Sequence, residues 1–188
     1  MSQDCISAIR EEVLSCCSCE LCKYRTRPVP GELMGSGKLF LVGEAPGKRE
    51  DELGRPFVGK AGILLRKTLD EVGAKDVYIT NAVKCRPPNN RTPTRSEIET
   101  CKPYLIREIS CLRPKVIVAL GKTASYALLG VDRSLKEMRG RRFQAEYGGV
   151  KVDVIVTYHP AAVVRNPKYL LPFKFDIRRA WEEVKGLG

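Results

Sequence analysis

The 188-residue sequence lacks any long apolar run and contains few amide side chains. No stretch approaches the roughly 20 apolar residues that cross a bilayer, and residues 1–17 carry acids where a secretion signal would have an apolar core. Only two glutamines and four asparagines accompany abundant lysine, arginine and glutamate, which is typical of a thermophilic source. We therefore expect a soluble, cytoplasmic protein without a membrane partner.

Acidic residues are also outnumbered by basic ones. The chain has 22 aspartates and glutamates against 33 lysines and arginines, a formal net charge of +11. This excess favours a polyanionic partner, with nucleic acid the first candidate and an anionic membrane surface the second. The length suits one well-buried core, so residues 1–188 are predicted to form a single domain.

Eight cysteines are many for this length, and in a reducing cytosol they indicate a metal site or catalysis more often than disulfides. Cys19-x-x-Cys22, followed much later by Cys85 and Cys101, predicts a four-thiolate site for zinc or an iron–sulfur cluster. Spacing alone favours zinc, and ordinary buried thiols are the alternative. An overlapping Cys16-x-x-Cys19 leaves the register open. The remaining thiols could be free or disulfide-bonded: Cys5, Cys16, Cys17 and Cys111.

Short apolar runs alternate with amphipathic stretches along the chain. Strands are predicted at 38–42, 77–80, 115–119 and 152–156, and helices at 2–14, 62–72, 95–110, 123–129 and 172–185. This alternation predicts an α/β fold with a mostly parallel sheet, to which a hairpin through Gly148-Gly149 adds an antiparallel strand.

Three long loops follow predicted strands, at 44–60, 84–94 and 158–172. Ligands of open parallel sheets bind beyond the carboxyl ends of the strands, so these loops should converge on one site. They offer a flat aromatic, Phe57, among glycines; an amide, Asn81, at a strand end; and His159, the only histidine. The glycine-rich loop alone would equally suit a phosphate cradle, and a lone histidine is often structural.

Taken together, these segments resemble the family 4 uracil-DNA glycosylases, the iron–sulfur branch of the uracil-DNA glycosylase superfamily. The resemblance spans nearly the whole chain and rests on the order of several motifs. Beside the cysteines they are GEAPG (43–47), GRPFVGKAG (54–62), TNAVKCRPPNNR (80–91) and YHPAAVVRNP (158–167). The resemblance implies a three-layer α/β/α sandwich around a four-stranded, mostly parallel sheet. It also implies a [4Fe–4S] cluster on Cys19, Cys22, Cys85 and Cys101 in place of zinc.

The same resemblance implies that the chain is a monofunctional hydrolase that excises uracil from DNA, with single- or double-stranded uracil-containing DNA as its partner and free uracil as its product. Phe57 should stack on an everted uracil, Asn81 should read its N3–H and O4 edge, and His159 should donate to O2. The better-known branch of the superfamily has an aspartate where this chain has Ala45, so the water-activating residue is open. Glu44 is the nearest carboxylate; it could hold the water, exclude a thymine methyl or merely cap its loop.

The remaining expectations concern the pocket wall and the DNA. Gly43 and Ala45 should line the base pocket with Glu44. DNA contacts are predicted from these residues: Lys60, Arg86, Arg91, Val163, Val164 and Arg165. We expect a monomer, and the resemblance leaves recruitment by a sliding clamp open. The rivals are a non-catalytic DNA-binding module and the sister iron–sulfur branch, whose substrates include hypoxanthine, ethenocytosine and mismatched thymine.

Overall fold

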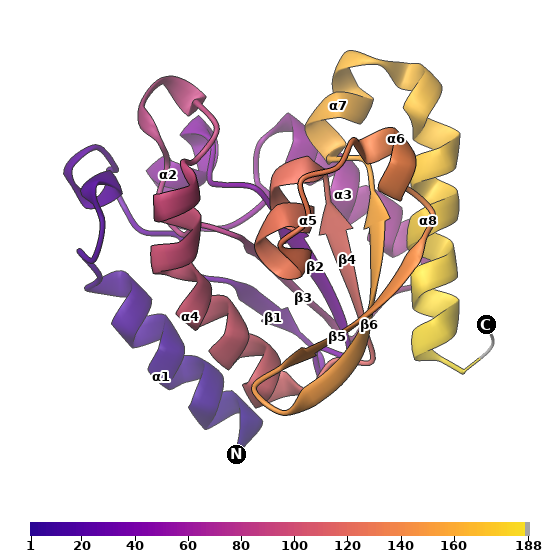
Figure 1. The fold of residues 1–188 in the computed structure, drawn as a ribbon, viewed down its shortest axis with the longest axis horizontal. Helices are drawn as coiled ribbons and strands as arrows, with labels where there is room; N and C mark the ends of the chain where they lie inside the picture. Colours follow the sequence, from indigo (N-terminus) through magenta and orange to yellow (C-terminus); the bar gives the residue numbers. More distant parts are fainter. Residues whose placement is uncertain (187–188) are drawn as a thin grey trace.

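The computed structural model describes residues 1–186 and consists of one six-stranded sheet between two layers of helices (Figure 1). The strand order is β1-β3-β2-β4-β6-β5. The four central strands run parallel, whereas β1 and β5 pair antiparallel at the two edges. The strands are β1 Glu32–Met34, β2 Leu39–Gly43, β3 Val77–Asn81, β4 Val116–Leu120, β5 Arg142–Tyr147 and β6 Val150–Thr157.

Helices cover both faces of the sheet because successive strand residues point to opposite sides. In β2, Leu39 and Leu41 pack under one helical layer, while Phe40 and Val42 pack under the other. The first layer contains α3 Lys60–Val72, α7 Pro160–Arg165 and α8 Leu170–Val184. The second contains α4 Arg95–Leu112, α5 Lys122–Leu129 and α6 Leu135–Met138. Figure 1 shows α1, Ser2–Leu14, lying alongside α4, to which a Cys5–Cys111 disulfide ties it.

The parallel register places the carboxyl ends of all four central strands at one edge of the sheet. Gly43 at the end of β2 lies opposite Asn81 at the end of β3, and Leu120 of β4 lies opposite Thr157 of β6. The loops that carry the predicted base-pocket residues therefore leave the sheet at this edge, which is where open α/β sheets bind ligands.

The predicted α/β/α class is confirmed, and the four predicted strands form the parallel centre of the sheet. The hairpin through Gly148-Gly149 also forms, between β5 and β6. The structure adds β1, a three-residue edge strand, and two six-residue helices inside predicted loops, α2 Lys48–Leu53 and α7. Segments this short carry too few residues for a periodic pattern. No helix within residues 1–186 combines the length and the hydropathy needed to cross a membrane.

Candidate functional site

A cavity of about 310 Å³ opens at the carboxyl edge of the sheet. Its wall includes Glu44, Phe57, Asn81 and His159, together with Ala45. These residues come from three loops that are far apart in sequence, and the common strand ends bring them together. The structure thus places an aromatic face, an amide, a carboxylate and an imidazole around one hollow.

Gly43 leaves room for the two groups that face each other across the end of β2. A Cβ atom at this position would lie 2.6 Å from both Asn81 Oδ1 and Phe57 Cζ, so any side chain here would displace one of them. Asn81 is 3% exposed, yet its side-chain amide makes no hydrogen bond with any other part of residues 1–186. The free donor and acceptor of this amide open onto the cavity, where they can read a complementary polar edge.

His159 caps the short helix α7 and is held in one tautomer. Its Nδ1 accepts a hydrogen bond from the Ala161 amide at 3.0 Å. Burial, reinforced by the charge of Arg165, lowers the pKa of His159 to about 4, although Glu50 opposes this shift. The imidazole is therefore neutral at pH 7, and its one proton lies on Nε2, which is available to donate.

Two carboxylates line the cavity, and only one of them is free for chemistry. Glu50 accepts hydrogen bonds from the amides of Gly47, Val58 and Gly59 and is thereby committed to the loop. Glu44 accepts a single hydrogen bond through Oε1, from Thr123 Oγ1 at 2.5 Å. Glu44 thus presents an anchored carboxylate whose second oxygen remains available.

A fully buried ion pair supports the loop behind Asn81. Lys84 and Glu108 are 2% and 1% exposed, and Lys84 Nζ lies 2.7 Å from Glu108 Oε1. The same ammonium donates to the backbone oxygen of Asn81 at 2.9 Å and to Thr80 Oγ1 at 2.5 Å. Tyr78 also hydrogen-bonds Glu108, and burial raises the pKa of this tyrosine well above its usual value. Lys84 is therefore an internal support for β3 rather than a surface cation.

The predicted DNA contacts divide into those at the cavity and those outside it. Arg165 and Arg91 line the cavity, and Arg91 is paired with Glu97 at 2.8 Å. Lys60 is exposed at the start of α3, and Arg86 bonds Asn90; neither contributes to the cavity wall.

Of the two valines predicted to contact DNA, Val163 and Val164, the structure corrects one. Val163 is 3% exposed and packs in the core beneath α7, so its side chain cannot reach a DNA groove. Its neighbour Val164 is 44% exposed on another face of the same helix. Helical geometry turns consecutive residues about 100° apart, so only one of the two can face a ligand.

A second hollow of about 600 Å³ adjoins the first and shares Glu44, His159 and Arg165 with it. Its far wall includes Arg95, Lys122, Thr123 and Tyr126, which sequence reasoning did not single out. Lys122 and Thr123 begin α5, one residue after the end of β4. A connection this short does not stand out in the sequence beside the three long loops.

The cysteines differ from the predicted ligand set. Cys22 is disulfide-bonded to Cys17, with 5.2 Å between their Cα atoms, and so cannot supply a thiolate. One hollow between the N-terminal segment and α4 is lined by Cys22 and by the four free cysteines: Cys16, Cys19, Cys85 and Cys101. The second register, Cys16-x-x-Cys19, is therefore the one that the fold leaves available.

The surroundings of these thiols bear on their use as metal ligands. Within residues 1–186, no group of three ligating side chains is placed to hold a single metal ion. Four cysteine thiolates are also the ligand set of an iron–sulfur cluster. Arg25 donates to Cys85 Sγ at 3.0 Å, and burial raises the pKa of Cys101 to about 12. When a metal binds such a site, the thiols become thiolates and release their protons to the solvent.

Comparison with known proteins identifies the family to which this architecture belongs. The family model of the uracil DNA glycosylase superfamily matches residues 30–185. The chain belongs to this superfamily. It is 47% identical to a type-4 uracil-DNA glycosylase of Pyrobaculum aerophilum over 92% of this chain and 91% of that protein. It is 45% identical to the type-4 enzyme of Thermotoga maritima over 87% of this chain and 85% of that one.

The same comparison separates two branches of the superfamily. A type-5 uracil-DNA glycosylase of Pyrobaculum aerophilum is 34% identical over 76% of this chain and 70% of its own length. The type-4 relative from the same organism is closer in both identity and coverage. These values assign the chain to the type-4 branch within the superfamily, as the motifs predict.

Proposed function

We propose that this protein is a monofunctional uracil-DNA glycosylase that hydrolyses the N-glycosidic bond of deoxyuridine everted from DNA. The observation that carries the proposal is the meeting of Phe57, Asn81, Glu44 and His159 around one cavity of about 310 Å³. A glycosylase cannot reach the glycosidic bond inside the stack, so the nucleotide must leave it at a cost of a few kcal/mol.

Base selection falls to Asn81 and Phe57. The free amide of Asn81 complements the N3–H and O4 edge of uracil, whereas cytosine presents the inverse pattern and would leave buried groups unpaired. The Phe57 ring supplies a face on which the everted base stacks. Gly43 supports both roles because its missing side chain lets ring and amide approach the same base.

His159 stabilises the departing base. Negative charge grows on the uracil as the bond breaks, and the Nε2–H of a neutral imidazole can donate to uracil O2. By analogy with one oxyanion-hole donor, this contact is worth roughly 3–4 kcal/mol in the transition state. The hydrogen bond from Ala161 to Nδ1 supports this role because it fixes the proton on Nε2 before substrate binds.

Glu44 is the group that we assign to the attacking water. Of the two cavity carboxylates it alone keeps an oxygen free, and Thr123 holds it in place. The residue after it is Ala45, so no aspartate competes for this role. Assays of Glu44→Gln on uracil and thymine substrates separate the two possible roles. If Glu44 positions the water, the variant should excise uracil more slowly. If Glu44 excludes the thymine methyl group, the variant should excise thymine faster.

DNA enters over the basic rim of the two hollows. Arg165 lines both hollows, and the exposed Val164 of the same helix is assigned as the wedge that fills the gap left by the everted base. Arg95 and Lys122 line the larger hollow, where a flanking strand would lie. Lys60 and Arg86 are assigned to more distant phosphates. Phosphate contacts of this kind release counterions, so affinity should fall steeply with salt.

A structural [4Fe–4S] cluster on Cys16, Cys19, Cys85 and Cys101 completes the proposal. The support is that these four free thiols share one hollow, while Cys22 is engaged by Cys17. A cluster held by these four residues would join the N-terminal segment to the loop after β3 and to α4, in a structural role.

One assay tests the activity. Purified protein is incubated with oligonucleotides that each carry a single uracil, thymine, hypoxanthine or cytosine, and alkali then cleaves any abasic site. We expect strand breaks at uracil. His159→Ala should lower the rate of uracil excision on the order of a hundredfold. Borohydride should trap no covalent complex, since no lysine lines the smaller cavity. Binding without abasic sites would instead support the DNA-binding module, and breaks at hypoxanthine the broader sister branch.

A further inference from the structure

The backbone of Phe57 is in a conformation that aromatic residues seldom adopt. Its φ is +53°, in the left-handed region, and the other non-glycine residues there in the described chain are Asn89, Asn90 and Arg113. The bulk of an aromatic side chain makes this region costly, and such residues persist only where their surroundings over-determine them. Phe57 is only 5% exposed and lines the cavity in this conformation. Contacts from neighbouring residues must therefore stabilise its backbone.

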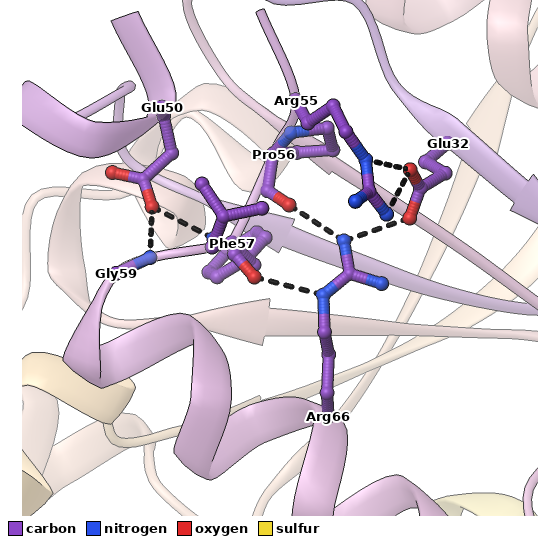
Figure 2. A network of polar contacts seen from close by, with 8 residues as sticks. Glu32, Glu50, Arg55, Pro56, Phe57, Gly59 and Arg66 are labelled. Carbon is purple, nitrogen blue, oxygen red and sulfur yellow. Dashed lines mark hydrogen bonds and ion pairs between the residues drawn. The ribbon is translucent and has the colours of Figure 1, made fainter. Parts of the chain in front are cut away.

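Arg66 of α3 holds the backbone from one side. Its Nε donates to the Phe57 carbonyl at 2.8 Å, and its Nη2 donates to the Pro56 carbonyl at 2.7 Å (Figure 2). Glu32 of β1 lies 2.7 Å from the same Nη2 and orients the guanidinium. The planar fork of an arginine is suited to two such parallel bonds, whereas a lysine can make only point contacts.

Glu50 of α2 holds the backbone from the other side. Its Oε2 accepts from the Val58 amide at 2.8 Å and from the Gly59 amide at 2.6 Å, as Figure 2 shows. The groups that flank Phe57 on both sides are thus fixed by charged side chains from two different helices. Gly62 completes the contact, because a Cβ atom there would lie 2.0 Å from the carbonyl carbon of Phe57.

We propose that Arg66 and Glu50 are positioning residues for uracil excision: together they clamp the strained backbone of Phe57 so that its ring faces the everted base. The proposal rests on the proposed function, since it assumes that the ring stacks on uracil. Neither residue need touch the base. Their effect on catalysis passes through the orientation of the ring, because small misplacements of a positioned group can slow a reaction up to about 100-fold.

Arg66→Gln tests the clamp, with Arg55→Gln as the matched control. Both arginines pair with Glu32, but Arg55 makes no bond to the backbone around Phe57 and its side chain is 56% exposed. We expect single-turnover uracil excision to fall about 10- to 100-fold in Arg66→Gln, inhibition by free uracil to weaken, and both to stay unchanged in Arg55→Gln. Equal losses in the two variants would overturn the proposal.

A double-mutant cycle separates the clamp from general stability. Phe57→Ala removes the ring and leaves the backbone, so adding Arg66→Gln should cause no further loss of excision rate. Losses that multiply in the double variant would show that Arg66 acts elsewhere and would overturn the proposal. If Arg66→Gln does not fold, Arg66→Lys serves in its place, because it keeps the charge beside Glu32 and one hydrogen-bond donor. We expect Arg66→Lys to excise uracil at an intermediate rate. A wild-type rate in this variant would also overturn the proposal.

The two proposals fail in different ways. A Phe57→Ala variant with wild-type excision would remove the stacking role and the clamp with it. A Phe57→Ala variant that loses excision, beside an Arg66→Gln variant that does not, would remove the clamp alone.

Discussion

Replacing Lys84 by methionine should destabilise the protein strongly, because it leaves a buried carboxylate without its cation. Methionine has a similar length, so little volume is lost, but Glu108 at 1% exposure would lose a partner at 2.7 Å. Breaking a buried ion pair in this way costs about 3–5 kcal/mol. For a chain of this size, each kcal/mol lowers the melting temperature by roughly 2–4 °C, so a decrease of about 6–20 °C is expected.

The double variant Lys84→Met, Glu108→Gln is the decisive control. It removes the unpaired charge while the glutamine oxygen still accepts from Tyr78, so much of the lost stability should return. Melting followed by circular dichroism, at matched iron content, measures all variants. If the double variant melts at or below the temperature of Lys84→Met, the reasoning from an ion pair is wrong.

The same substitution should also slow uracil excision, since Lys84 Nζ donates to the backbone oxygen of Asn81 at 2.9 Å. The rate should stay low in the double variant even where stability recovers, because methionine offers no donor to that oxygen. Recovery of both properties together would mean that the contact with Asn81 has no part in base reading.

Three further outcomes are expected. The rate of uracil release should stay flat as pH falls through 6.5 and drop only near pH 4, since burial lowers the pKa of His159 and keeps the imidazole neutral. The contribution of this histidine to the stability of the fold is complete above pH 6.5. It declines between pH 6.5 and about 4, because only the unfolded chain takes up the proton in this range. A rate that halves near 6.5 would contradict this. Asn81→Asp should shift excision toward cytosine or abolish it, as oligonucleotides with either base will reveal, and unchanged uracil excision would remove Asn81 from base reading. Cys16→Ser should lower iron and sulfide below about four of each per chain, whereas Cys22→Ser should retain them; the reverse result restores the Cys19-x-x-Cys22 register.

Local patterns were sufficient for most of the fold. The central strands are short apolar runs bounded by turns, and the longer helices have one apolar face, so each could be predicted from its own residues. The edge strand β1 and the helices α2 and α7 could not, because segments this short carry no periodic pattern of their own, and β1 forms only by pairing with β3. The strand ends also predicted where the loops would meet.

Only the folded chain distinguishes between similar residues that are neighbours in the sequence. Adjacent cysteines gave two equal registers, and only the disulfide between Cys17 and Cys22 distinguishes them. Neighbouring valines looked alike, yet the helix turns Val163 into the core and Val164 outward. Lys84 is a charged residue in a loop motif, and nothing in the sequence indicates that Glu108 would neutralise it inside the protein.

The sequence by itself determined the four central strands, their parallel direction and the family, because each follows from residues close together in the chain or from motifs in a fixed order. The tertiary structure alone decided which thiols remain free, which side chains are buried, and how Arg66 and Glu50 hold Phe57 from two helices. Those facts depend on contacts between distant segments, whose distances and burial are set only when the whole core packs.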